Sequence, residues 1–229
     1  SLLMNLYELA SLDELSSSDD NMIYENVLFK IGSHVWKNLL PEHPDTPSKL
    51  SELFEVLTTY ENDFECSKGY SFLLKGFIRH DTWTGIADFI DWWNLDKLTT
   101  EDYIPYQMEN GRTVMSLAEQ AFITQAKALL RLNNRERIEA FLPQLEELTE
   151  RYPAMSYPGY FYGKLLLSLG EMNAEALQAL IPFARRKASE FWVWQLLSEA
   201  FANEEDKQLA CLLRAVHCRT QESFLGKVR

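Results

Sequence analysis

The chain has 229 residues, of which 46% are hydrophobic and 13% aromatic, enough apolar material for a core of its own. Its formal net charge of −12 lies in the first half: residues 1–110 carry 20 acidic and 7 basic side chains, whereas residues 111–229 carry 14 acidic and 15 basic ones. Nucleic-acid backbones are bound by clustered lysine and arginine, so this balance argues against a general nucleic-acid-binding surface.

The cysteines indicate a reducing compartment. Cys66, Cys211 and Cys218 are an odd number without a CxxC pair, and no segment resembles a signal peptide. The longest apolar runs are far shorter than the ~20 residues of a membrane-spanning helix. We therefore expect a soluble cytoplasmic protein with no membrane partner. The first residue is Ser1 rather than methionine, which suggests a piece of a longer polypeptide.

In the first half, apolar residues recur every three or four positions, as in helices with one buried face. Helices are expected at 1–15, 21–40, 70–80 and 81–98, with another that begins at Thr46-Pro47. In the helix expected at 81–98, the adjacent Trp92 and Trp93 side chains point about 100° apart, so one packing surface cannot bury both. We expect a neighbouring helix to cover the second tryptophan; the alternative is an exposed interface.

A polar stretch with Pro105 and Gly111, residues 99–112, separates the acidic half from a more regular second half. We place a domain boundary there, which gives an acidic helical region, 1–110, and a repeat region, 111–229. Second-half helices are expected at 114–132, 135–152, 159–170 and 173–188, with two more within 191–218. Very short turns require neighbouring helices to lie antiparallel, so the predicted fold is all-α.

Small residues recur at similar intervals in this second half. Ala126, Gly163 and Ser198 are 37 and 35 residues apart. In the following helices Ala140, Ala176 and Ala210 come 14, 13 and 12 residues later. A small residue on each helix lets two antiparallel helices approach closely, so the spacing predicts stacked helical pairs.

The last unit, with Trp194, Leu197, small Ser198, Phe201 and Ala210, resembles a tetratricopeptide repeat. Residues 118–218 share the resemblance more loosely. The segment is also similar to helical-repeat regions of uncharacterised bacterial proteins associated with conflict systems. The resemblance implies an α-solenoid whose groove holds a peptide or partner helix, with the acidic first half capping the stack or blocking its groove.

By position, the resemblance makes four residues the candidates for contact with a partner protein: Gln125, Lys164, Gln195 and Glu199. The alternative is that these are ordinary solvated surface residues. The implied function is a protein–protein interaction scaffold or regulatory module, without a cofactor.

The sequence gives less support to two other functions, an enzyme and a nucleic-acid-associated protein. An enzyme would need a site assembled in space, because none of the histidines has zinc-site spacing and no phosphate-binding glycine loop is present. His80 and Asp81 could form an acid/base dyad, but a histidine beside a carboxylate at a helix end usually caps the helix or complements its dipole. Asp88 and Asp91 project from one helix face, and we interpret them as solvent-exposed carboxylates rather than as a Mg²⁺ site. Binding of a nucleic acid or of an acidic partner would use the basic cluster 185–187. These cations lie near the end of a predicted helix, where they complement the helix dipole, so the cluster does not require a ligand.

Overall fold

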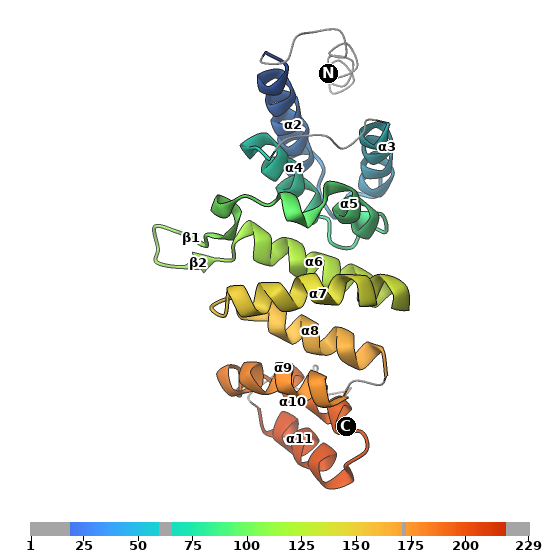
Figure 1. Ribbon diagram of the computed structural model, residues 1–229, viewed down its shortest axis with the longest axis vertical. Coiled ribbons are helices and arrows are strands. Elements are labelled where there is room, and N and C mark those ends of the chain that lie inside the picture. Colours follow the sequence, from blue (N-terminus) through green and yellow to red (C-terminus); the bar gives the residue numbers. More distant parts are fainter. Residues whose placement is uncertain (1–18, 60–65, 171–172, 219–229) are drawn as a thin grey trace. The chain divides into compact units, whose positions relative to one another are not determined.

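The computed structural model describes residues 19–59, 66–170 and 173–218, and these are mostly helical, as the sequence predicts (Figure 1). The expected helix at 1–15 lies outside the described residues. The α-helices are α2 (Asp19–Asn38), α3 (Thr46–Thr58), α4 (Lys68–Ile78), α5 (Ile86–Trp93), α6 (Leu117–Leu132), α7 (Arg135–Arg151), α8 (Tyr157–Ser168), α9 (Asn173–Arg186), α10 (Phe191–Ala200) and α11 (Glu205–His217). Two short 3₁₀ helices, η2 (Leu95–Lys97) and η3 (Thr100–Tyr103), follow α5.

Local chemistry explains several helix starts. Pro47 stands in the first turn of α3, as predicted, where its missing N–H leaves no bond unmade. The Ser67 hydroxyl accepts a hydrogen bond from the Tyr70 N–H at the start of α4. The Asn134 carboxamide does the same for the Arg137 N–H at the start of α7.

The stretch between the two halves contains a β-hairpin that the sequence analysis did not predict. Strand β1 (Tyr106–Gln107) pairs antiparallel with β2 (Thr113–Val114), so the helix expected from residue 114 begins at Leu117. The turn is closed by Gly111, whose φ is +77°, and by the Asn110 side chain, which accepts from the Arg112 N–H. An Asn-Gly pair is a known hairpin signal, because both residues tolerate positive φ.

The chain forms two compact units, Ser1–Ala128 and Leu129–Arg229, and the division falls inside α6. The boundary predicted at 110 precedes α6. In the first unit, α2 packs directly against α4 through glycines. A Cβ atom on Gly76 would lie 2.7 Å from the Gly32 carbonyl oxygen, and one on Gly69 would lie 2.2 Å from the Glu25 oxygen. These glycines therefore allow contact between the two backbones.

The two adjacent tryptophans are both covered. Trp93 is fully buried, stacks on Tyr70 at 4.5 Å between ring centroids, and donates its indole N–H to the Tyr70 carbonyl. Trp92 is half buried, with its ring 5.9 Å from that of Phe54 on α3. A neighbouring helix covers the second tryptophan, as expected.

In the second unit, each helix from α7 to α11 packs against the next, and α8 also contacts α10 (Figure 1). The core between the last two helix pairs includes Leu180, Phe183, Leu196 and Leu197. None of the helices in the described part of the chain is both long enough and apolar enough to cross a membrane.

The small residues predicted on the first helices are buried at all three positions: Ala126, Gly163 and Ser198. On the second helices, Ala176 is buried, but Ala140 and Ala210 are exposed. The prediction that these two alanines lie between packed helices is wrong. The buried positions are the next residues along, Phe141 and Cys211, because one residue rotates the side chain by about 100° around a helix.

Candidate functional site

A pocket of about 410 Å³ lies over α8 and α10 in the second unit. We call it the α8–α10 groove. Its walls come from Leu130, from α8 with the turn after it (Lys164, Leu167, Ser168 and Gly170), and from α10 with the turn after it (Glu199, Ala202 and Asn203).

Two of the four predicted contact residues, Lys164 and Glu199, line this groove. Burial raises the pKa of the Glu199 carboxyl above its ordinary value, and the positive charge of Lys164 opposes that rise. The groove therefore places opposite charges on two neighbouring helices, one of them partly withdrawn from water.

Tyr160 adjoins this charged pair and was missed by the sequence analysis. The Lys164 ammonium lies 5.9 Å from the centroid of its ring, and burial together with the negative charge of Glu199 raises the pKa of its hydroxyl to about 12. Its ring also packs 5.0 Å from that of Trp192. Sequence spacing could have identified Tyr160 as a candidate. It precedes Lys164 by four residues, or one helical turn, just as the candidate Gln195 precedes Glu199.

The other two predicted residues do not line the groove. Gln195 is half buried on α10, one turn before Glu199. Gln125 belongs to the first unit, is 1% exposed, and donates its amide N–H to Asp91 Oδ1 at 2.6 Å. The Gln125 Oε1 atom has no hydrogen-bond partner among the described residues. A side chain so buried and bonded supports the fold, and we remove Gln125 from the candidate site.

Of the residues that an enzyme could use, His80 is buried, and Asp81 and Asp91 contact other side chains. His80 is 3% exposed, and burial lowers the pKa of its imidazole. Its neighbour Asp81 pairs with Lys127 at 3.1 Å, while Asp91 accepts from Gln125. Within residues 19–59, 66–170 and 173–218, no group of three or more His, Cys, Asp or Glu side chains could hold a metal ion.

Comparison with protein families gives one match. A family model described as a domain of unknown function, DUF7017, matches residues 156–229. The match covers α8 to α11 and every wall of the α8–α10 groove except Leu130. The searches of curated proteins and of solved structures gave no match.

Proposed function

We propose that the second unit is a tetratricopeptide-like α-solenoid region whose α8–α10 groove binds a peptide or helix of a partner protein. The chain then serves as a scaffold or regulatory module rather than as an enzyme. We also propose a cytoplasmic location, in keeping with the three free cysteines.

The spacing within the groove carries this proposal. Its walls contain three pairs of residues whose members are 35 residues apart: Lys164 and Glu199, Leu167 and Ala202, Ser168 and Asn203. Stacked copies of one helical pair present equivalent positions on the same side, so a single groove is the expected result.

Burial follows the same 35-residue interval. Small buried residues occupy Ala128, Gly163 and Ser198 on the first helices. Buried residues on the second helices recur in two sets: Phe141, Ala176 and Cys211, then Leu145, Leu180 and Ala215. This constant interval of 35 residues supports the repeat interpretation. It differs from the intervals of 37 and 35 residues in the sequence alignment because Ala128, rather than Ala126, corresponds to Gly163 and Ser198.

The chemistry of the groove suits a polypeptide. The Lys164 ammonium can donate to a peptide carbonyl, the Glu199 carboxylate can accept from a peptide N–H, and the Asn203 amide can do both. Leu167 and Ala202 add apolar contact between these polar groups. A groove of this kind recognises an extended chain by its backbone and by small side chains.

The test is selection of 12-residue peptides from a random displayed library on the purified protein, followed by fluorescence polarisation with the selected peptides. Lys164→Glu should weaken binding about tenfold or more, because it replaces a donor with a like charge beside Glu199. Lys30→Glu makes the same charge change on an exposed residue of α2 and should leave the affinity unchanged. Equal affinities for wild type and Lys164→Glu would remove the groove from consideration.

A further inference from the structure

A second pocket, of about 490 Å³, lies among α9, α10 and α11. We call it the α9–α11 pocket. Its walls are mainly apolar, with Ile181 and Ala184 from α9 and Trp194, Leu197 and Phe201 from α10 and the residue after it. Among the described residues of the wall, Arg185 is the charged one and none is a carboxylate, although the whole chain has a net charge of −12.

Cations lie against both aromatic walls of this pocket. The Arg214 guanidinium is 5.7 Å from the centroid of Trp194, and the Lys207 ammonium is 5.3 Å from that of Phe201. Lys207 also pairs with Glu204, whereas Arg185 and Arg214 form no ion pair within the described residues. The Trp194 indole N–H donates to the Ala188 carbonyl at 2.8 Å, which fixes the ring in place.

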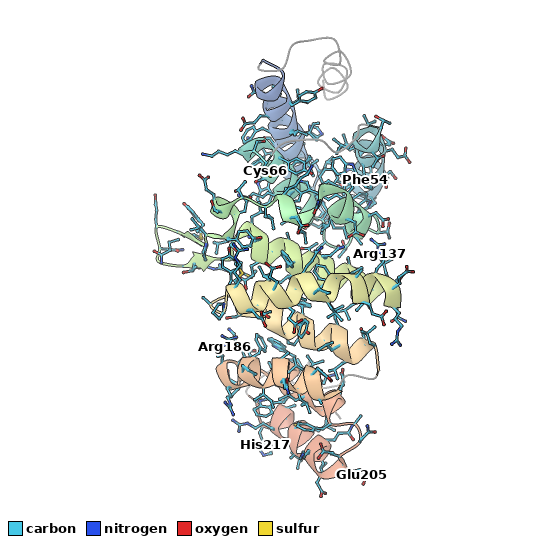
Figure 2. All side chains as sticks on the ribbon, viewed as in Figure 1. Phe54, Cys66, Arg137, Arg186, Glu205 and His217 are labelled. Atoms are coloured by element: carbon cyan, nitrogen blue, oxygen red, sulfur yellow. The ribbon has the colours of Figure 1, made fainter. Side chains whose placement is uncertain are left out.

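Two more basic residues lie at the end of α9. Arg186, at the last position of α9 (Figure 2), donates to the Pro153 carbonyl, and both Arg186 and Pro153 line a different pocket, the one among α7, α8 and α9. Lys187 lies 5.9 Å from the ring centroid of Tyr157. The basic border of the apolar α9–α11 pocket therefore consists of Arg185 in its wall and of Arg214 and Lys207 against its aromatic rings.

A pocket of about 390 Å³ occupies the corresponding place 35 residues earlier, among α7, α8 and α9. Six of its wall residues, Glu146, Thr149, Glu150, Pro153, Gly159 and Tyr162, hold the positions of Ile181, Ala184, Arg185, Ala188, Trp194 and Leu197. This earlier pocket stays open although α10 and α11 follow it. A further helical pair after α11 would therefore leave the α9–α11 pocket open as well.

The comparison also shows what is particular to the later pocket. Among the described residues, the walls of the earlier one carry three carboxylates and one cation (Glu146, Glu150, Glu175 and Arg186), whereas those of the later one are mainly apolar, with Arg185 as the charged residue. Ile181 is 38% exposed at its mouth. An exposed apolar recess of this kind costs free energy in water unless another molecule covers it.

We propose that the α9–α11 pocket is a docking site for an acidic amphipathic segment of a partner protein. Apolar side chains of that segment enter between Trp194 and Phe201, and its carboxylates pair with Arg185 and Arg214. The charge complementarity selects this occupant over a basic or neutral peptide. The site is separate from the α8–α10 groove, because it uses Trp194, Leu197 and Phe201, which lie on a different face of α10 from Glu199.

The test uses two fluorescein-labelled 14-residue peptides with the same leucine spacing, one with glutamate and one with lysine at all other positions. The glutamate peptide should bind the full chain in fluorescence polarisation, and the lysine peptide should not. Arg185→Glu and Ile181→Glu should each weaken binding about tenfold. Leu209→Glu, at an exposed leucine of α11 outside the pocket, is the matched control and should bind normally.

Several outcomes would overturn the docking site. These are equal binding of both peptides, insensitivity to Arg185→Glu and Ile181→Glu, and no binding at all. A dimer in analytical ultracentrifugation that Ile181→Glu dissolves would make a second copy of the chain the occupant. Binding that appears only in a chain ending at Cys218 would assign the pocket to residues 219–229. Circular dichroism verifies that each variant is folded, and Lys164→Glu, which tests the α8–α10 groove, should leave binding of the glutamate peptide unchanged.

Discussion

Gly163 of α8 lies directly against Leu180 of α9. A Cβ atom at position 163 would stand 2.5 Å from Leu180 Cγ and 3.2 Å from the Ala176 carbonyl oxygen. Leu180 is 1% exposed and has no room to move aside. The contact between these two helices therefore depends on the absence of a side chain at position 163.

Gly163→Ala should lower the free energy of unfolding by about 1–3 kcal/mol, because the added methyl group overpacks a filled interface. Gly159→Ala, one turn earlier on the same helix, is the matched control. The nearest atom to its added Cβ is 4.0 Å away, so the change should be neutral or stabilising by up to about 1 kcal/mol. Urea denaturation of both variants measures the difference, and equal stabilities would mean that α8 and α9 do not approach so closely.

Gln125→Glu should destabilise the protein by roughly 2–5 kcal/mol. The substitution puts a second carboxylate where the Gln125 amide now donates to Asp91, in a buried position. Gln195→Glu changes a half-buried glutamine on α10 and should cost much less. Thermal denaturation followed by circular dichroism compares the two. A Gln125→Glu variant as stable as wild type would return Gln125 to the set of surface contact residues.

Glu199→Gln should raise the melting temperature at pH 7–8. The raised pKa means that the fold disfavours the ionised carboxyl, so the neutral amide removes a cost that the wild type bears. As the pH falls through the Glu199 pKa, which lies above its ordinary value of 4.5, wild-type Glu199 becomes neutral and the advantage should vanish. Melting curves at several pH values provide the measurement. An advantage that persists in acid would assign the effect to something other than ionisation.

The His80 imidazole gives the opposite dependence on pH. Burial, reinforced by the positive charge of Arg79, lowers its pKa below 6.5, so the fold favours the neutral ring. Below pH 6.5 the unfolded chain takes up a proton that the folded chain resists, and stability should fall. In His80→Gln this contribution is absent.

The stability difference between wild type and His80→Gln should therefore narrow from pH 7.5 to pH 5.5. Urea denaturation across that range is the measurement. Parallel stability curves for the two proteins would show that His80 does not titrate differently on folding.

The sequence by itself determined the helical character and most helix positions. Apolar periodicity, the proline at position 47 and the caps at Ser67 and Asn134 act within a few residues, so they can be read locally. The resemblance to a tetratricopeptide repeat also named Lys164 and Glu199 as candidate contact residues, and both line the α8–α10 groove. The β-hairpin was overlooked, although Asn110-Gly111 is a local signal that could have predicted it.

Tertiary structure alone decided which small and polar residues are covered. All residues from 121 to 126 on α6 are buried, so amphipathic spacing could not show that Gln125 faces inward. Likewise, only packing distinguishes exposed Ala210 from buried Cys211, because adjacent residues differ by a rotation of about 100°. The α9–α11 pocket depends on three helices at once. Local sequence sets the helix, but burial depends on which neighbours surround each face.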